Sequence, residues 1–296
     1  MDAVTSADPA TTDPVKTVFI DVDGTILEHG SIIAPSTVSA IRAARAAGHA
    51  VYLCTGRALG DIHPAVLEIG FDGAITNGGA FGAIGDELVL SHPMPRTQVD
   101  RLVEYFETHG IHYFLQTYDS VYASAGMDDL ISAFVRQRRE TYADDLAGLG
   151  VDADEEMVEP VRTFGPVTEA VLDDVVKAVF ISTASDSLDR AQADLGDTFH
   201  VIPGSIPMPG GSNGEIGMLG VNKGAAITEL LAHLGRDAAD AVGIGDSWND
   251  VEMFQVCGTS VAMGNADPQL QAMADHVTTS VLDDGVRNAF VTLGLI

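Results

Sequence analysis

Residues 18–27 read VFIDVDGTIL, an apolar run that leads into two carboxylates and a Gly-Thr turn. A short apolar run bounded by turn residues is typical of a buried strand in a parallel sheet. Because strand side chains alternate between faces, Asp21 and Asp23 lie on the same side at the strand's carboxyl end. In open α/β sheets, ligands bind at that end. Two carboxylates crowded there can divide the roles of nucleophile and general acid.

The same motif also fits a plain turn, because Asp and Gly are ordinary turn residues, so its meaning depends on its neighbours. A second apolar run, residues 50–54, is followed at once by Thr55, Gly56 and Arg57. A helical pattern separates the two runs, and a right-handed strand-helix-strand unit lays the second strand parallel beside the first. Thr55 then lies next to Asp21, where a hydroxyl and the N–H groups of a Gly turn can bind a phosphate oxygen. A plain turn is the alternative for these three residues taken alone.

The composition is strongly acidic: 43 Asp and Glu against 15 Lys and Arg give a formal charge of −28. A nucleic-acid binder needs clustered basic residues, and this chain has only three lysines, Lys16, Lys177 and Lys223. We therefore expect no nucleic-acid or membrane partner. An anionic substrate is repelled at long range, so phosphate chemistry in this chain needs a local cation. With 296 residues, the chain is long enough for two domains or for one large α/β domain.

The two cysteines, Cys54 and Cys257, lie in apolar segments and are expected to be buried free thiols. Residues 1–15 lack the basic-then-apolar order of a signal peptide, so we expect a disordered leader. No apolar run approaches the length of a membrane span. Together these features predict a cytoplasmic protein.

The pattern changes between residues 82 and 219, where short strand-like pieces alternate with helical ones. We expect this region to be a self-contained α+β unit inserted between two parts of the core, residues 16–81 and 220–296. Within the insertion, residues 207–214 read PMPGGSNG and are expected to form a flexible hairpin connection.

The core pattern resumes with a helix for which Asn222 is a suitable N-cap and Gly235 a suitable end. Lys223 therefore falls in the first helical turn, where the helix dipole disfavours a cation. A bound anion nearby would explain this placement, because it would interact with both the ammonium and the free N–H groups. A solvated surface lysine is the alternative.

A further apolar run, residues 241–244, ends in GDSWND at 245–250. Asp246 and Asp250 therefore follow a second strand, with Asn249 beside them to orient them. Together with the first pair, four carboxylates meet near one point and would destabilise one another without a cation. Hard oxygen ligands with room for water and a phosphate are what Mg²⁺ selects, so we expect a magnesium site.

Four segments in this order resemble the motifs of the haloacid-dehalogenase-like phosphatase superfamily: DVDGT at 21–25, TGR at 55–57, Lys223, and GDSWND at 245–250. Three further segments resemble the Cof-like branch of that superfamily: TNGGA at 76–80, VAMGNA at 261–266, and DDGV at 283–286. That branch carries an α/β cap between its second and third motifs, where this chain has its insertion. The resemblance implies an α/β fold, with a Rossmann-like parallel-sheet core and an inserted α+β cap domain at 82–219 that sets substrate specificity.

The resemblance further implies a Mg²⁺-dependent phosphomonoester hydrolase that acts on small phosphorylated metabolites, sugar phosphates foremost, through an aspartyl-phosphate. Asp21 would attack the phosphoryl group, and Asp23 would protonate the leaving group and then activate water. The implied metal-binding residues are Asp21, Asp23 through its backbone carbonyl, Asp246, and Asp250 through the metal shell or by orienting the lysine. The implied phosphate-binding residues are Thr55, Gly56, Arg57, Lys223 and Asn249.

Two other functions are open at this point. A phosphomutase would use the same nucleophile but return the phosphoryl group to the sugar, so its product would be an isomerised sugar phosphate. The second is a non-catalytic sensor of phosphorylated metabolites. Loss of Asp21, Asp23 or Lys223 would have favoured this hypothesis, but all three residues are present. For the oligomeric state we expect a monomer or a weak homodimer.

Overall fold

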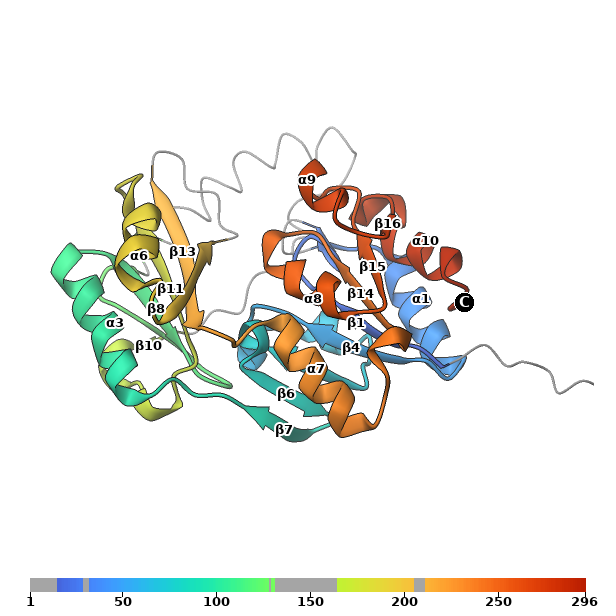
Figure 1. Cartoon of the computed structure of the whole chain (residues 1–296), viewed down its shortest axis with the longest axis horizontal. Coiled ribbons are helices and arrows are strands. Elements are labelled where there is room, and N and C mark those ends of the chain that lie inside the picture. Colours follow the sequence, from blue (N-terminus) through green and yellow to red (C-terminus); the bar gives the residue numbers. More distant parts are fainter. Residues whose placement is uncertain (1–14, 29–31, 128, 131–163, 205–210) are drawn as a thin grey trace, which may run out of the picture.

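The computed structural model describes residues 15–28, 32–127, 129–130, 164–204 and 211–296. Within these ranges the chain forms two bodies, each built on its own sheet, which lie side by side in Figure 1. The larger body has an eight-stranded sheet and the smaller body a six-stranded sheet. The expected disordered leader lies outside the described residues except for Val15.

The larger sheet is mostly parallel and has the expected first strand near its centre. Its order is β16 (His276–Val277), β15 (Thr259–Ala262), β14 (Ala241–Gly245), β1 (Thr17–Ile20), β4 (Ala50–Cys54), β5 (Gly73–Thr76), β6 (Phe81–Ile84) and β7 (Glu87–Ser91). The strands from β16 to β5 run parallel, and β6 and β7 are antiparallel to their neighbours. The βαβ unit predicted from the first two apolar runs is confirmed, because β1 pairs in parallel with β4.

Helices cover both faces of the larger sheet, as expected of an α/β fold. On one face, α1 (Pro35–Ala46) and α10 (Gly285–Thr292) pack on Val18 and Ile20 of β1. On the other face, α7 (Lys223–Leu234) and α8 (Val251–Val256) pack on Phe19. Successive side chains of β1 therefore pack into two different hydrophobic cores, one on each face of the sheet. Because both faces are buried, the sequence of this strand is a continuous apolar run.

The remaining elements of the larger body are short. They are β2 (Leu27–Glu28), β3 (Ile32–Ile33), α2 (Pro64–Leu67), α9 (Pro268–Gln271), and 3₁₀ turns at Leu59–Asp61, Asn77–Gly79, Ala238–Asp240, Trp248–Asp250 and Val281–Asp283.

Among the described residues, the smaller body is a sheet with the helices α3 (Arg96–His109) and α6 (Ser187–Leu195) on one face. Its strand order is β10 (Gly165–Pro166), β9 (Val121–Ala123), β8 (His112–Gln116), β11 (Lys177–Ser182), β13 (Ser212–Met218) and β12 (Phe199–Pro203). The helices α3 and α6 lie on the outer side of this sheet in Figure 1, and 3₁₀ turns lie at Val167–Glu169 and Leu172–Asp174. The opposite face of the sheet is turned toward the larger body, and Ile181 and Phe114 on it pack with Ala58.

Two boundaries differ from those expected from the sequence. The insertion was expected to begin at residue 82, but β6 and β7 extend the larger sheet, and the chain crosses to the smaller body only after Ser91. The physical reason is the tight turn Asn77–Gly79, which folds β6 back as an antiparallel neighbour of β5. The expected loop 207–214 is shorter, because β13 already begins at Ser212, and residues 205–210 lie outside the described part.

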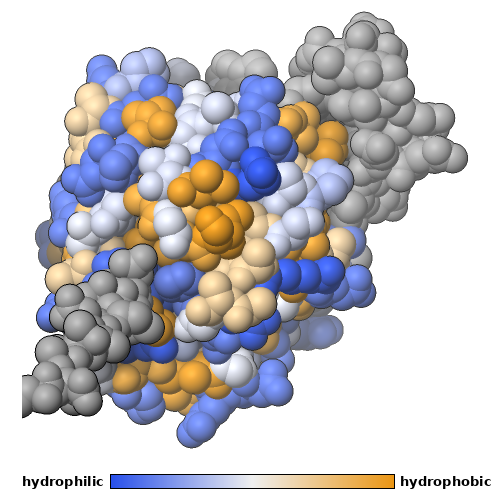
Figure 2. All heavy atoms as spheres, turned by 90° about the vertical axis from the view of Figure 1, so that its right-hand side faces the viewer, coloured by the Kyte–Doolittle hydropathy of each residue, from blue (hydrophilic) through white to orange (hydrophobic). Residues whose placement is uncertain are grey.

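The surface carries separate hydrophobic patches among hydrophilic residues on the face that bears the C-terminus (Figure 2). Exposed apolar side chains near the C-terminal end of the chain include Leu282, Val291 and Ile296. Both cysteines are buried and free, as predicted. In the described part of the chain, no helix has the length and apolar character that crossing a membrane requires.

Candidate active site

Asp21 lies at the carboxyl end of the central strand, where the sequence predicted it. Its N–H donates to the carbonyl of Ile244 on the neighbouring strand at 2.9 Å, which continues the sheet by one residue. Val22 is buried in the core on the α1 face, so Asp21 points to the α7 face. The Asp21 residue is only 3% exposed, which makes its carboxylate dependent on nearby partners.

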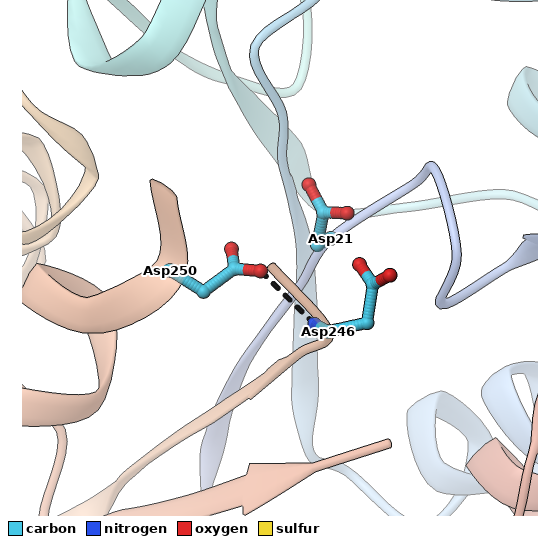
Figure 3. A group of neighbouring side chains, drawn as sticks. All are labelled: Asp21, Asp246 and Asp250. Carbon is cyan, nitrogen blue, oxygen red and sulfur yellow. Dashed lines mark hydrogen bonds between the residues drawn. The ribbon is translucent and has the colours of Figure 1, made fainter. Parts of the chain in front are cut away.

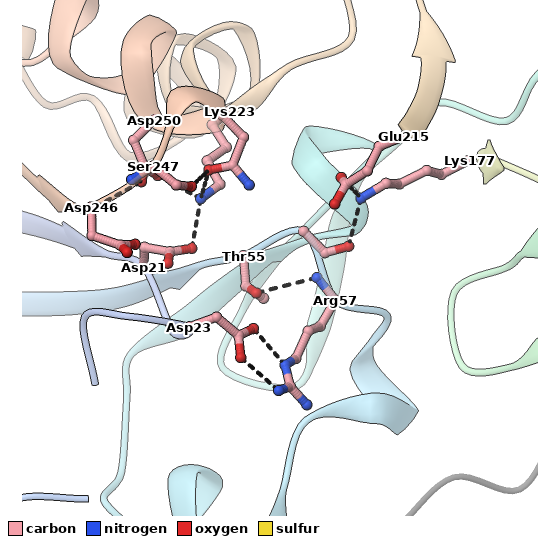
Figure 4. A network of polar contacts seen from close by, with 12 residues as sticks. Asp21, Asp23, Thr55, Arg57, Lys177, Glu215, Lys223, Asp246, Ser247 and Asp250 are labelled. Carbon is pink, nitrogen blue, oxygen red and sulfur yellow. Dashed lines mark hydrogen bonds and ion pairs between the residues drawn. The ribbon is translucent and has the colours of Figure 1, made fainter. Parts of the chain in front are cut away.

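Lys223 is the main partner of Asp21 and is itself buried, with 1% of its surface exposed. Its ammonium donates to Asp21 Oδ1 at 2.6 Å, to Asp250 Oδ1 at 2.6 Å and to Asn249 Oδ1 at 3.3 Å. These three acceptors match the three donors of an ammonium. The solvated-lysine alternative is therefore wrong, and Lys223 joins the ends of β1 and of the loop after β14 (Figure 4).

The helix start that carries Lys223 follows the predicted capping chemistry. The Asn222 side chain accepts from the Ala225 N–H at 2.8 Å, and Gly235 ends α7 in the left-handed conformation. The Asn77–Gly79 turn packs against this helix start, since a Cβ on Gly79 would lie 2.2 Å from the carbonyl oxygen of Asn222. Only glycine allows this approach, so the turn and the helix start hold one another in place.

Asp250 is fully buried and both of its oxygens accept hydrogen bonds. Oδ1 accepts from Lys223, and Oδ2 accepts from the N–H groups of Asp246 and Ser247, each at 3.0 Å. Ser247 completes a capping box with Asp250 at the start of this turn. The arrangement fixes the loop after β14 and aims Lys223 at Asp21.

The three carboxylates of Asp21, Asp246 and Asp250 converge on one point in Figure 3, and one oxygen from each lies within 4.8 Å of the others. Asp246 Oδ1 is buried and has no hydrogen-bond partner among the described residues. A buried carboxylate oxygen left in this way costs free energy unless a cation binds it. Hard oxygen ligands crowded in this way fit a divalent cation such as Mg²⁺.

The crowding also raises the pKa of two of these carboxyl groups. Burial raises the pKa of Asp21 to about 7, with further contributions from Asp250 and Asp23, against the opposing charge of Lys223. Burial and the charges of Asp21 and Asp250 raise the pKa of Asp246 to about 9. Without a cation the folded protein therefore disfavours the charged forms of both acids.

Gly24 and Asn265 hold Asp246 in position. Gly24 has a φ of 80°, and a Cβ on it would lie 2.0 Å from Asp246 Oδ2. Asn265 Nδ2 donates to the Gly24 carbonyl at 2.8 Å and lies 3.4 Å from Asp246 Oδ2. Asn265 lies in the segment VAMGNA, but no role was assigned to it from the sequence, because its partners are separated from it by up to 241 residues.

The Thr55–Arg57 turn lies beside Asp21 and Asp23, as the parallel pairing requires (Figure 4). Thr55 is 1% exposed, and its Oγ1 accepts from the Arg57 N–H at 3.2 Å, so its own O–H can donate to a ligand. The Arg57 guanidinium donates two hydrogen bonds to the Asp23 carboxylate, at 2.7 Å from Nε and at 2.6 Å from Nη2. The sequence pattern made Arg57 a candidate for phosphate binding but did not identify Asp23 as its partner.

A second lysine of the chain reaches the same turn from the smaller body. Lys177 Nζ donates to the carbonyl of Gly56 at 3.0 Å and forms an ion pair with Glu215. The sequence signalled neither residue, although Lys177 is one of only three lysines. All residues assigned to catalysis, metal or phosphate thus lie around the ends of β1, β4 and β14: Asp21, Asp23, Thr55, Gly56, Arg57, Lys223, Asp246, Asn249 and Asp250.

Comparison with known proteins agrees with this arrangement. The family model that describes haloacid dehalogenase-like hydrolases matches residues 18–290 of this sequence. The 5-amino-6-(5-phospho-D-ribitylamino)uracil phosphatase YwtE of Bacillus subtilis is 29% identical over 284 residues, which cover 92% of this chain and 96% of that protein. The pyridoxal phosphate phosphatase YbhA of Escherichia coli is 26% identical over 276 residues, which cover 92% and 96%.

Solved structures show the same fold. The sugar phosphatase BT4131, of subclass IIB of the haloacid dehalogenase superfamily, has a TM-score of 0.75 at 22% identity and covers 95% of this chain and 100% of that chain. A haloacid dehalogenase-like hydrolase from Bacillus subtilis also has a TM-score of 0.75 at 22% identity, with coverage of 94% and 100%. Both bodies of the present chain are therefore parts of one known architecture.

Proposed function

Because this chain belongs to the haloacid dehalogenase-like hydrolases, as a phosphatase of their Cof-like branch, we propose that it is a Mg²⁺-dependent phosphomonoester hydrolase. Its substrates are small phosphorylated metabolites, sugar phosphates foremost, and its intermediate is an aspartyl-phosphate. The observation that carries the proposal is the 2.6 Å contact of buried Lys223 Nζ with Asp21 Oδ1 at the end of the central strand. A fixed cation beside this carboxylate supports the proposal, because it can offset the charge of a phosphoryl group there.

Asp21 acts as the nucleophile in this mechanism. One of its carboxylate oxygens forms a bond to phosphorus while the bond from phosphorus to the leaving oxygen breaks. Asp23, two residues on, gives its proton to the leaving oxygen and later takes a proton from the water that attacks the aspartyl-phosphate. The two hydrogen bonds from Arg57 orient Asp23 from the turn that would bind the phosphate. They also favour its carboxylate form, so this ion pair has to open before Asp23 can donate a proton.

The phosphoryl oxygens are held by two groups with donors to spare and by a fixed positive charge. Thr55 offers its O–H, Gly56 its backbone N–H, and Lys223 its ammonium. Asn249 and Asp250 accept hydrogen bonds from Lys223, so we assign them to orienting that ammonium. The two oxygens of Asp250 are engaged by three donors, which favours this positioning role over direct metal binding.

Asp21, Asp246 and the backbone carbonyl of Asp23 would hold the Mg²⁺ ion. When bound, the metal supplies positive charge that offsets the charge of the phosphoryl group. The unpartnered Asp246 Oδ1 supports this ligand set. A local cation is also what a chain with a formal charge of −28 requires in order to bind an anionic substrate.

The smaller body serves as a cap in this proposal. It lies across from the ends of β1 and β4, and the chain enters it after Ser91 and leaves it before Lys223. Its open sheet face would therefore surround the leaving group, while the larger body carries out the phosphoryl chemistry.

Release of free phosphate from a panel of phosphorylated metabolites tests the proposal. We expect release that depends on Mg²⁺, stops with EDTA, and is lost in Asp21→Asn. Full turnover by Asp21→Asn would refute the assignment of the nucleophile. Isomerised sugar phosphate without free phosphate would replace the hydrolase by a phosphomutase, and the absence of both products would leave binding alone.

A further inference from the structure

A buried ion pair of the smaller body faces the catalytic turn. Lys177, at the start of β11, is 5% exposed, and the side chain of Glu215 on β13 is 15% exposed. The two side chains lie on the same face of the sheet, because Glu215 is opposite Val179, two residues along β11 from Lys177. Figure 4 shows both reaching toward the turn that carries Thr55 and Arg57.

The sheet face around this pair carries apolar side chains as well as two buried polar residues, Gln116 opposite Lys177 and Asn213 two positions before Glu215. Phe114 and Ile181 of the same sheet are buried with Ala58 of the larger body, and Val179 packs against them. An ion pair in such a setting adds little stability, because desolvation of the two charges offsets their attraction. Apolar side chains would join the two bodies as well. Stabilising the contact between the two bodies therefore does not explain why an ion pair is present at this place.

Both partners keep hydrogen-bonding capacity. The Lys177 ammonium has three donors, and among the described residues its acceptors are the Glu215 carboxylate and the Gly56 carbonyl, at 3.0 Å from Nζ. Glu215 uses Oε2 for the lysine, and Oε1 has no donor within the described part of the chain. One donor and one acceptor therefore remain side by side for a ligand.

The position of the pair fits the leaving group and not the phosphoryl group. A Cβ on Gly56 would lie 3.2 Å from Lys177 Nζ, 3.6 Å from Glu215 Oε2 and 3.8 Å from Asn249 Nδ2. Gly56 therefore lies between the ion pair and the residues around Lys223. In an in-line displacement the leaving oxygen departs opposite the attacking Asp21, toward the body that faces it.

From this geometry, and on the basis of the proposed function, we infer that Lys177 and Glu215 read hydroxyl groups next to the scissile ester oxygen. A hydroxyl both donates and accepts, so neighbouring hydroxyls satisfy the lysine donor and the glutamate acceptor together. A second phosphate or a carboxylate at the same place would meet the negative charge of Glu215. An apolar alcohol would leave the remaining lysine donor and glutamate acceptor without a hydrogen-bond partner, which disfavours such a substrate.

Four phosphomonoesters test this inference with the full chain and Mg²⁺: glycerol 1-phosphate, ribitol 5-phosphate, n-propyl phosphate, which lacks the hydroxyls, and 2-phosphoglycolate, which carries a carboxylate. We expect the wild type to have a kcat/KM about 10- to 100-fold higher for a polyol phosphate than for n-propyl phosphate. The double variant Lys177→Met with Glu215→Gln removes both charges and so leaves no buried charge unpaired. It should lose that preference while n-propyl phosphate turnover stays within about threefold.

Two further variants sharpen the test. Glu215→Gln should raise kcat/KM for 2-phosphoglycolate relative to the polyol phosphates, because it removes the repelling charge. Lys16→Met, which breaks an ion pair with Asp240 on the larger body, is the matched control and should leave the selectivity unchanged. Thermal melting of each variant verifies that it is folded.

Equal losses for all four esters in the double variant would assign the pair a structural role and overturn the inference. A wild type that treats n-propyl and polyol phosphates alike would overturn it as well. Both results leave the proposed hydrolase intact. If the wild type releases phosphate from none of the four esters, the proposed function fails and the inference falls with it.

Discussion

Replacing Asp246 with Asn should stabilise the metal-free protein and remove its response to Mg²⁺. Oxygens of Asp21, Asp246 and Asp250 lie within 4.8 Å of one another, and two unit charges at that separation repel by about 3 kcal/mol at an effective dielectric of 20. Asp246 faces two carboxylates and the Lys223 ammonium, so roughly one such repulsion is uncompensated. Protonation of Asp246, whose pKa is raised to about 9, relieves it only at a comparable cost.

Thermal unfolding in EDTA and in excess Mg²⁺ measures both effects. In EDTA the Asp246→Asn variant should melt about 5 to 10 °C above the wild type, since 1 kcal/mol corresponds to about 2 to 4 °C in a large domain. Mg²⁺ should raise the Tm of the wild type and leave that of the variant unchanged. Asp86→Asn, at an exposed position in the turn between β6 and β7, is the control for loss of one negative charge and should follow the wild type.

Two results would refute this reasoning. A variant that melts below the wild type in EDTA would mean that Asp246 stabilises the metal-free fold through its contacts and is not under repulsion. An equal Mg²⁺ response in the variant and the wild type would mean that Asp246 is not a metal ligand.

Three more perturbations have defined outcomes. Lys223→Met should lower kcat at least about 100-fold, because it removes a buried donor to the phosphoryl group; steady-state phosphate release measures this, and a loss below tenfold would contradict it. Gly24→Ala should abolish both activity and the Mg²⁺-induced rise in Tm, because its Cβ would lie 2.0 Å from Asp246 Oδ2. An unchanged Mg²⁺ titration would contradict this, because it would show that the loop at Gly24 can shift without loss of metal binding. Burial alone would raise the pKa of Asp72, but hydrogen bonds from Arg45 and from a strand N–H outweigh it and lower the pKa, so this carboxylate stabilises the fold above its ordinary titration range. Asp72→Asn should therefore lower the free energy of unfolding by about 1 to 2 kcal/mol near pH 7, and the difference should shrink as the pH falls toward 3; denaturant unfolding at several pH values checks the trend.

The sequence predicted well which residues meet at the carboxyl end of the larger sheet, because most of the determinants are local. An apolar run followed by acids places Asp21 at a strand end, and the right-handed crossover places Thr55 beside it. Asn222 and Gly235 mark the ends of α7 through short-range capping, which fixes where Lys223 enters the first turn. The strand end and the helix caps depend on residues within a few positions of one another, and the crossover joins two consecutive strands of the sheet; the structure agrees with each expectation.

What the sequence could not predict depends on contacts between distant segments. The strand-like pattern at Leu88–Leu90 predicts a strand, but only packing decides that β7 (Glu87–Ser91) joins the larger sheet and not the smaller one. Arg57 donates to Asp23, and Asn265 lies within 3.4 Å of Asp246. Both contacts depend on how separate loops come together at the carboxyl edge of the larger sheet. The secondary-structure propensity of a segment does not predict which distant segment it contacts.

The sequence by itself thus predicted which carboxylates, lysine and hydroxyl gather where strands end, and it led to the expectation of a cation beside them. Tertiary structure alone decided that Lys223 is buried between Asp21 and Asp250, and that Lys177 reaches the catalytic turn from the smaller body. The physical reason is range. Turn residues and side-chain periodicity act over a few positions, whereas the contact between Lys177 and Gly56 spans 121 residues and exists only after both bodies have packed.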